Sequence, residues 1–355
     1  MNSQFFKFNL NNDHIEIKHS ISIEYFLMNE KLFTFILIGC FISILITPII
    51  FEQRIMSPPV IMNEKILNPD RDYMSIVTIP FPLVVPGYFE KLHLSVSNWL
   101  MTSPSTKVVL LVNHSEFDLD RKFYNLIESE FGPGRLKYGP CYSTDRNNIP
   151  YVHDQVLKSV TGSDSNIITI INSDILLPGN WLKNINRVLD ILGNSACITG
   201  YRVNFNLTWP TTWKIHYNTT EIFSDISKLI SSGQPKDYGY RGMDFFTFRT
   251  DPTPIDLHLH PPMIIGRFDY DTWLMGAMNY WAESVSLGTE YRSAHIAHLD
   301  KNYSRTLPLP NCNKRIRWMY WKFDGDNLKT NWAVQNSTLI HRKNQIRIDF
   351  DDFIL

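Results

Sequence analysis

The sequence predicts an α/β domain, a Rossmann-like mixed sheet with helices packed on both of its faces. Three short runs of apolar, mostly β-branched residues have the length of buried strands: 75–80, 108–112 and 167–171. Segments whose apolar residues recur at helical spacing separate these runs. Strands that are apolar throughout and alternate with helices are typical of βαβ units, in which both faces of the sheet are covered. The alternation therefore predicts the fold class.

The expected elements follow in a regular order up to Gly200. In the first helix, over 88–101, residues such as Leu92, Val96 and Trp99 recur on one face. The same spacing and further β-branched runs predict helices over 119–130, 149–160 and 181–192 and a strand over 196–200. Beyond this point the region is more aromatic and polar. Its expected elements are a helix over 221–231, a strand over 242–248, a helix over 269–280 and a strand over 294–298.

The composition is that of a folded protein with one large core. The chain has 355 residues, of which 44% are hydrophobic and 13% aromatic. That length and apolar content suit one large domain with accessory segments. The 34 basic and 35 acidic residues almost cancel. Because the chain has no basic block interleaved with aromatic residues, we expect no nucleic-acid partner.

An uncharged apolar run over 32–50 dominates the N-terminal part of the chain. It has about the length that a helix needs to cross a hydrocarbon layer of roughly 30 Å. A cleaved signal peptide is a poorer interpretation because the run starts late and ends in bulky residues; a buried core helix is the alternative. We expect a cytosolic tail over 1–30, a transmembrane signal anchor over 31–51, a stem over 52–72 and an α/β domain over 73–345.

Residues beyond the expected anchor favour a luminal location for the main domain. All Asn-X-Ser/Thr sequons lie there, at Asn113, Asn206, Asn218, Asn302 and Asn336. Cys40 falls inside the anchor, so the other three cysteines form at most one disulfide bond and do not decide the compartment. We expect a single-pass type II protein of the Golgi or endoplasmic reticulum membrane, held there by its one transmembrane helix.

The tripeptide Asn172-Ser173-Asp174 directly follows the strand expected over 167–171. In open α/β sheets, ligands gather outside the carboxyl ends of the strands. A carboxylate there suits Mg²⁺ or Mn²⁺, and such a cation neutralises the diphosphate of a nucleotide sugar. We expect Asp174 to bind the metal and Asn172 to contact the nucleotide sugar. The plain alternative for Asp174 is a loop aspartate without a ligand.

A second candidate metal ligand lies in the segment His295-Ile296-Ala297-His298. Two histidines three residues apart point to different sides of an extended strand, so at most one of them reaches the ion. We favour His298. The alternative is an ordinary half-buried histidine.

The segment 265–274 carries two acids just before and within a predicted helix. Asp271 is the candidate catalytic residue, because a carboxylate near an acceptor hydroxyl can remove its proton. For Asp269, capping of the helix is the plain interpretation. Arg267 pairs either with a phosphate group or with Asp269. We expect Arg267 and Trp273 on the side of the site where the acceptor binds.

Asp244 lies inside the aromatic, strand-like run 242–248. A carboxylate is costly to bury without a partner. Asp244 therefore either binds a substrate, with the acceptor preferred, or forms an internal ion pair with Arg241 or Arg249. The two alternatives weigh equally.

An ordered set of motifs resembles a group of eukaryotic glycosyltransferase-like proteins with the GT-A fold of nucleotide-diphospho-sugar transferases. The motifs are TIP (78–80), INSDILL (171–177), GMDFFTF (242–248), IGRFDYDTWL (265–274) and HIAHLDKNY (295–303), and the resemblance covers roughly 74–305. Matched position by position, it makes Asp174 the metal-binding aspartate, Asp271 the acid of the fourth motif and His298 the second histidine of the last. Two residues of the fourth motif depart from the group: Tyr270 replaces the usual Trp and Thr272 the usual Asn. In the last motif, Ile296 and Leu299 differ from the group's pattern as well.

The resemblance implies a metal-dependent glycosyltransferase that uses a nucleotide-diphosphate sugar, a divalent cation (Mn²⁺ or Mg²⁺) and a glycan or glycoconjugate acceptor. From strand-end positions we expect Thr78, Asn113 or Glu116 near the base of the donor and Arg146 near its phosphates or ribose. An Asn113 that lines the donor site cannot also carry a glycan. The alternatives are a catalytically inactive relative that binds a glycan or partner and, less favoured, a nucleotidyltransferase. Retention and inversion of the anomeric configuration are both open.

Overall fold

The computed structural model divides into two units, Met1–Lys65 and Ile66–Leu355, and its described residues all lie in the second. These are 74–81, 83, 87–112, 117–139, 144, 150–179, 181–205, 236–237, 239–250, 253, 260–265, 269–288, 291–296, 313, 323–335 and 337–349. The expected tail, membrane anchor and stem lie outside them. Within these ranges, no helix combines the length and the apolar character needed to cross a membrane.

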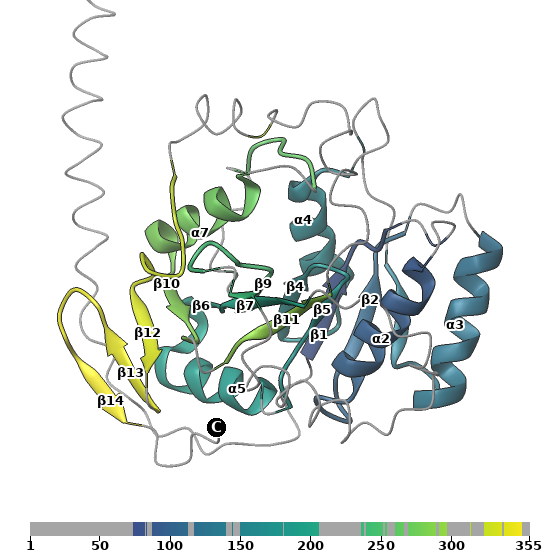
Figure 1. Ribbon diagram of the computed structural model, residues 1–355, viewed down its shortest axis with the longest axis horizontal. Coiled ribbons are helices and arrows are strands. Elements are labelled where there is room, and N and C mark those ends of the chain that lie inside the picture. Colours follow the sequence, from purple (N-terminus) through teal and green to yellow (C-terminus); the bar gives the residue numbers. More distant parts are fainter. Residues whose placement is uncertain are drawn as a thin grey trace, which may run out of the picture. The chain divides into compact units, whose positions relative to one another are not determined.

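A ten-stranded mixed sheet forms the centre of the domain (Figure 1). Its order is β14-β13-β12-β10-β6-β9-β4-β1-β2-β3. The strands on the N-terminal side are β1 (Met74–Thr78), β2 (Lys107–Leu110), β3 (Leu136–Tyr138) and β4 (Ile167–Ile171), all parallel. The others are β6 (Ala196–Thr199), β9 (Phe245–Arg249), β10 (Glu283–Ser286), β12 (Trp332–Gln335), β13 (Thr338–His341) and β14 (Arg347–Asp349). Because β9 runs antiparallel to both β4 and β6, the sheet is mixed, as the sequence predicts.

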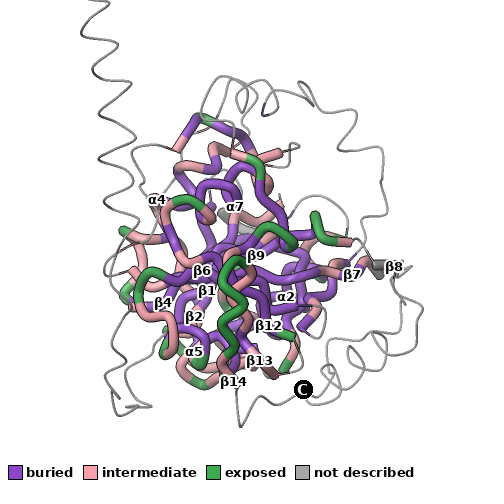
Figure 2. The backbone as a smooth tube through the Cα atoms, turned by 90° about the vertical axis from the view of Figure 1, so that its left-hand side faces the viewer, coloured by how far each residue is buried: buried purple, intermediate pink, exposed green. Residues whose placement is uncertain are grey.

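Helices cover both faces of this sheet. They are α2 (Tyr88–Leu100), α3 (Phe117–Phe131), α4 (Val152–Gly162), α5 (Trp181–Leu192) and α7 (Tyr270–Trp281), with a short 3₁₀ helix over Gly193–Ser195. Neighbouring residues of β1 enter different cores: Ile76 packs with Trp99 and Trp181 of α2 and α5, whereas Val77 packs with Val156 of α4. Figure 2 shows the central strands buried along their length. The prediction of strands apolar on both sides is confirmed.

A second, four-stranded sheet lies beside the first, in the order β5-β11-β7-β8. Its strands are β5 (Ile175–Leu176), β7 (Arg202–Phe205), β8 (Lys236–Asp237) and β11 (Ser293–Ile296). Strand β5 follows β4 after a turn of three residues, so the end of β4 in the large sheet is joined directly to the small one. The sequence signals this second sheet only weakly, since its strands have two to four residues and pair over long distances.

Several expected boundaries differ from the observed ones. The helix expected over 149–160 begins at Val152, since a bridge between Tyr151 and Ile264 keeps the preceding residue extended. The strand expected over 242–248 begins at Phe245, and that over 294–298 is Ser293–Ile296. The large sheet continues to Asp349. The helix expected over 221–231 falls outside the described residues.

Helix α7 is held close to the segment 323–325 by two glycines. A Cβ atom on Gly276 would lie 2.6 Å from the backbone nitrogen of Asp324, closer than atoms of ordinary proteins approach. A Cβ atom on Gly325 would lie 2.3 Å from the backbone nitrogen of Gly276. The Gly325 amide donates a hydrogen bond of 3.0 Å to the Thr272 carbonyl. This backbone-to-backbone contact fixes the helix whose first turn carries Asp271.

We expect Gly276→Ala to destabilise the protein although alanine is the better helix former. In an unobstructed helix the change stabilises by about 0.5–1 kcal/mol. Here the added methyl group collides with backbone that cannot rotate away, which reverses the sign and costs about 2–3 kcal/mol. Urea unfolding of the two proteins measures the difference. A gain in stability would contradict the close packing of α7.

Candidate active site at the carboxyl end of β4

The candidate site forms where β4 ends and the chain turns toward β5. The residues in the turn are Asn172, Ser173 and Asp174. The Asp174 carbonyl accepts a hydrogen bond of 3.0 Å from the Ile296 amide, and His295 stands opposite Ile175 in the antiparallel pair of β5 and β11. The backbone ladder therefore brings a histidine from the far end of the domain to the metal-binding candidate.

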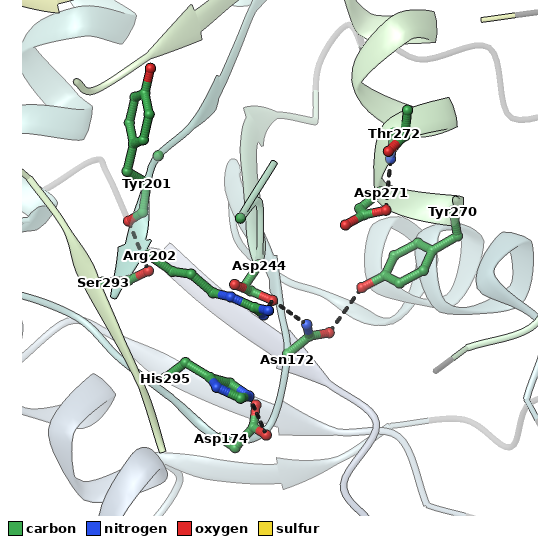
Figure 3. A network of polar contacts seen from close by, with 12 residues as sticks. Asn172, Asp174, Tyr201, Arg202, Asp244, Tyr270, Asp271, Thr272, Ser293 and His295 are labelled. Atoms are coloured by element: carbon green, nitrogen blue, oxygen red, sulfur yellow. Dashed lines mark hydrogen bonds and ion pairs between the residues drawn. The ribbon is translucent and has the colours of Figure 1, made fainter. Parts of the chain in front are cut away.

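His295 is the histidine that meets Asp174. Its Nε2 atom lies 3.2 Å from Oδ2 of Asp174, and the side chains are only 12% and 7% exposed (Figure 3). The prediction favoured His298, which lies outside the described residues, so that part stays a prediction; among the described residues, the histidine at Asp174 is His295. The register of β11 on β5 decides the matter, because it places His295 beside the turn.

The chemistry of this pair fits a hard divalent cation. Metal–ligand bonds of 2.0–2.1 Å at right angles place neighbouring ligand atoms about 3 Å apart, close to the observed separation. Among the described residues, no three His, Cys, Asp or Glu side chains gather as a complete metal site. A cation held here takes its remaining ligands from water and substrate, as Mg²⁺ commonly does with one or two carboxylates and the phosphates of a bound nucleotide.

A buried lysine adds positive charge to this part of the site. Lys91 of α2 is 7% exposed. Burial lowers the pKa of its amine, while the negative charge of Asp174 acts in the opposite direction. Sequence reasoning missed Lys91. The only signal was a lysine on the otherwise buried side of the helix over 88–101, where a cation needs an anionic partner.

Beside the Asp174–His295 pair, a chain of hydrogen bonds joins four segments (Figure 3). Arg202 of β7 donates from Nη1 to Oδ1 of Asp244 at 2.6 Å. Asn172 donates from Nδ2 to the same oxygen at 2.8 Å, and its own Oδ1 accepts from the Tyr270 hydroxyl at 3.0 Å. The amide of Asn172 is thus engaged on both sides by the protein. It holds the loop before β9 and the start of α7 against the end of β4.

Asp244 forms an ion pair, but not with either expected arginine. Its partner Arg202 comes from β7, and the two side chains are 5% and 15% exposed. Arg249 pairs instead with Asp190 at 3.6 Å, and Arg241 is exposed beside the ring of Tyr240. Sequence reasoning recognised that a buried Asp244 requires a cation. The partner was missed because the pairing depends on the position of the small sheet.

We expect Arg202→Met to destabilise the protein by about 3–5 kcal/mol, because it leaves the buried Asp244 carboxylate without its charge partner. The double variant Arg202→Met/Asp244→Leu removes both charges and should recover part of that loss. Chemical unfolding of the two single variants and the double variant completes a cycle. Equal stability of Arg202→Met and the wild type would show that the pair contributes nothing.

Asp271 stands in the first turn of α7, close to this network. Its Oδ1 atom accepts a hydrogen bond of 2.8 Å from the Thr272 amide. Burial raises the pKa of Asp271 from 3.8 to about 6, and the negative charges of Asp244 and Asp269 add to the rise. A carboxylate whose pKa lies near neutral pH exchanges protons readily under physiological conditions. Of the predicted site residues, Asp271 has the property that general base catalysis requires.

Several predicted roles do not agree with the structure. Trp273 is fully buried between His260, Trp281 and Phe323, so its ring is not placed to contact an acceptor. Asp269 stands at the N-cap position of α7, as the capping interpretation expects, but its backbone is left-handed (φ 78°) and its side chain makes no capping hydrogen bond to the described residues of the helix.

The donor-side predictions can be located only in part. Thr78 ends β1 and is fully buried, and its hydroxyl has no hydrogen-bond partner among the described residues. Asn113, Glu116, Arg146 and Arg267 lie outside the described ranges.

Tyr270 was noted in the sequence only as a departure from the tryptophan usual at this position. Its hydroxyl group is what reaches Asn172. Burial raises the pKa of Tyr270, so the phenol stays protonated and remains a donor. The available signal was a tyrosine in place of tryptophan at 270, together with an asparagine at the end of the strand expected over 167–171.

Comparison with solved structures gives three similar nucleotide-sugar enzymes. The chain is similar to S. aureus TarS in complex with UDP-GlcNAc (12% identity, TM-score 0.40, 66% of this chain and 61% of that one). It is similar to the mannosyltransferase PcManGT from Pyrobaculum calidifontis in complex with GDP-Man and Mn²⁺ (9%, 0.37, 74% and 66%). It is also similar to GalNAc-T7 with UDP, GalNAc and Mn²⁺ (11%, 0.41, 72% and 50%).

The chain thus spans half to two thirds of the length of these three proteins. No protein-family model and no curated protein sequence matches it. TM-scores under 0.5 at such low identity decide neither the fold family nor the activity of this chain. The functional argument rests on its own residues.

Proposed function

We propose that this chain is a metal-dependent glycosyltransferase with a GT-A fold, which moves a sugar from a nucleotide-diphosphate sugar to a glycan or glycoconjugate acceptor. One observation carries the proposal. A carboxylate–histidine pair with the spacing of two metal ligands stands in the turn after β4, and a carboxyl group with a pKa of about 6 stands in the first turn of α7, where the neighbouring Tyr270 is hydrogen-bonded to Asn172 of the same turn. The carboxyl end of a strand such as β4 is the place where open α/β sheets bind their ligands.

Asp174 and His295 are the residues that would hold the cation. When bound, a divalent cation supplies positive charge to the diphosphate that leaves with the nucleotide. Lys91 adds a second positive charge on the α2 side of Asp174. A leaving group that carries two phosphate charges is stabilised by such preplaced positive groups. Asn172, whose amide is engaged by Asp244 and Tyr270, positions the turn instead of contacting the donor through its side chain.

Asp271 is the proposed general base. Its carboxylate takes the proton from the acceptor hydroxyl as that oxygen attacks the anomeric carbon, and the bond between the sugar and the diphosphate breaks. Direct attack of this kind inverts the anomeric configuration. Asp244 stays the candidate for substrate binding, through Oδ2, which is buried and has no hydrogen-bond partner among the described residues.

The remaining predictions complete the proposed enzyme. Asn113, Glu116 and Arg146 stay candidates for the donor side, and Arg267 for the phosphates or the acceptor. The apolar run 32–50 anchors the protein in the Golgi or endoplasmic reticulum membrane, with the catalytic domain in the lumen. Glycosylation at Asn113 would argue against its role in donor binding.

The second candidate is a catalytically inactive, membrane-anchored protein that binds a glycan or partner. The observation that favours it is the engagement of Asn172 within the protein, at a position where many transferases carry an acid. Such a protein would bind its ligand without transferring a sugar, whichever metal is supplied.

Calorimetric titration of the full-length protein in detergent with UDP- and GDP-sugars, with and without Mn²⁺, tests the proposal. We expect one donor class to bind only when Mn²⁺ is present and its nucleotide to be released slowly in water. Binding that ignores the metal, or no binding by any common donor, would overturn the enzyme proposal. Metal-dependent binding without any nucleotide release would favour the inactive relative.

A further inference from the structure

The small sheet places Asn204 beside the candidate metal ligand His295. In the parallel pair of β11 and β7, these two residues stand opposite each other. Adjacent strands lie about 4.8 Å apart, and residues opposite each other project from the same face of a sheet. Arg202 stands two residues before Asn204 on β7 and therefore projects from that face too. Because its guanidinium group reaches Asp244, this face of the small sheet is the one that borders the candidate site (Figure 3).

The side chain of Asn204 carries a hydrogen-bond acceptor that no described residue uses. Its Oδ1 atom is buried and has no hydrogen-bond partner among the residues that the structure describes. Buried carbonyl oxygens are seldom left in this state, because the energy lost with water is then not recovered. The position of Asn204 beside His295 indicates where a donor for this oxygen can come from.

Metal binding by His295 would create such a donor. Nε2 is the ring nitrogen that faces Asp174, 3.2 Å from Oδ2, so it is the atom that a cation held by the pair would use. A neutral imidazole that binds a metal through one nitrogen carries its proton on the other, which here is Nδ1. In nearly all metal sites with histidine, this second N–H donates to a carboxylate, a carbonyl or a water molecule, and the bond fixes the orientation of the ring.

The covalent geometry of the two side chains suits a bond between Nδ1 of His295 and Oδ1 of Asn204. Each atom is bonded to the Cγ atom of its own residue, so both stand at a similar distance from two backbones that are paired in register. Nε2 of His295 lies farther from the backbone, at the side of Asp174. The register therefore sets the asparagine oxygen beside the inner ring nitrogen and leaves the outer one for the cation.

We propose that Asn204 is a positioning residue of the metal site, whose Oδ1 atom accepts the Nδ1–H of His295 and holds Nε2 toward the cation. The asparagine acts through the histidine ring and makes no bond to the metal. Its amide is neutral, so it orients the ring without adding a second negative charge beside Asp174. The inference rests on the proposed metal-dependent function and adds to it the residue that fixes the orientation of the metal-binding histidine.

Mn²⁺ affinity of the full-length protein in detergent tests the proposal by electron paramagnetic resonance, without any donor. Asn204→Leu keeps the branched shape of the side chain and removes its amide. We expect it to weaken Mn²⁺ binding by about 10- to 100-fold, the usual effect of losing a partner that orients a metal ligand. Asn204→Asp keeps an oxygen acceptor at the same place and should bind Mn²⁺ at least as tightly as the wild type. The matched control, Asn166→Leu, removes a half-buried amide just before β4, at the end of the strand away from the site.

A double variant separates this role from a direct bond to the cation. Once His295→Ala has removed the ring, Asn204→Leu should weaken Mn²⁺ binding no further. Additive losses would show that Asn204 reaches the metal by itself, and an Asn204→Leu variant with wild-type Mn²⁺ affinity would show that it has no part in the site; either result would overturn the proposal. An equal loss in Asn204→Asp and Asn204→Leu would overturn it as well.

The same titrations distinguish a failure of this inference from a failure of the proposed function. A wild type that binds Mn²⁺ but no nucleotide sugar, together with the expected effects at Asn204, would overturn the transferase and leave the role of Asn204 standing. Metal-dependent donor binding that ignores Asn204 would do the reverse. A wild type that binds no Mn²⁺ would overturn both.

Discussion

Replacing Asp174 with asparagine is expected to lower Mn²⁺-dependent donor binding and sugar transfer by at least about 100-fold. The change removes the only carboxylate of the pair that Asp174 forms with His295 and leaves a neutral amide of the same shape. Loss of groups that merely orient a metal ligand already costs 10–100-fold, and a direct ligand contributes more. Because the carboxylate is 7% exposed and ladder contacts fix its backbone, no other side chain can move into its place easily.

The measurement is Mn²⁺ affinity by electron paramagnetic resonance, followed by donor titration at saturating metal. Asp164→Asn is the matched control, since Asp164 is exposed and pairs with Lys137 at the opposite end of β4. His295→Gln should weaken Mn²⁺ in the same direction. If Asp174→Asn retains the Mn²⁺ affinity of the wild type, Asp174 is not a ligand, and the contact with His295 is an ordinary ion pair.

The central part of the fold follows directly from local sequence. Runs such as 167–171 are apolar at every position but Thr169, and a short, β-branched run of this kind is typical of a strand buried on both faces. Local patterns of this kind do not predict the small, four-stranded sheet. Strand β5 has only two residues. Strand β11 pairs with β7, which lies far away in the sequence, and no local pattern indicates the register of that pairing. Elements stabilised chiefly by long-range pairing are therefore the ones that the sequence leaves undetermined.

The candidate site shows the same difference between residues that local sequence indicates and residues that long-range strand pairing places. Asp174 and Asp271 were named as candidates because each stands at a recognisable boundary, the end of a strand or the start of a helix. His295 was set aside for His298, since a shift of register alters which side chain faces the turn. Arg202 was missed for the same reason, because it reaches Asp244 from a strand of the small sheet. Sequence reasoning predicted which groups needed partners, and the topology decided which partners they received.

Asp271→Asn is expected to lower the turnover number by about 100- to 10,000-fold, the usual range for the loss of a general base. Asparagine keeps the oxygen that accepts from the Thr272 amide, so the first turn of α7 is retained. The wild-type rate should rise tenfold per pH unit up to about pH 6, where Asp271 loses its proton, and then level off. The rate of the Asp271→Asn variant should not rise with pH in this range. Nucleotide release from the donor, with water or acceptor as the attacking group, is the quantity to follow.

The same substitution should make the protein more stable at neutral pH, which distinguishes a lost base from a damaged fold. The pKa of Asp271 is raised on folding, so the folded protein binds a proton that the unfolded chain releases between about pH 4 and pH 6. Stability contributed by the protonated form is therefore lost as the pH rises through this window. The neutral amide of Asp271→Asn escapes that loss and should gain roughly 2–3 kcal/mol at pH 8 but almost nothing at pH 4.

Asp324→Asn is the matched control for both measurements, because Asp324 is exposed and pairs with Lys329 at 2.7 Å. Low activity with unchanged or reduced stability at pH 8 would mean that Asp271 is not held in a desolvated state, and its role as the base would then lose its physical ground. Low activity combined with higher stability is the signature of a carboxylate kept under strain for catalysis. Active sites commonly show this opposition between stability and function, since the environment that tunes a pKa toward neutrality also disfavours the charged form.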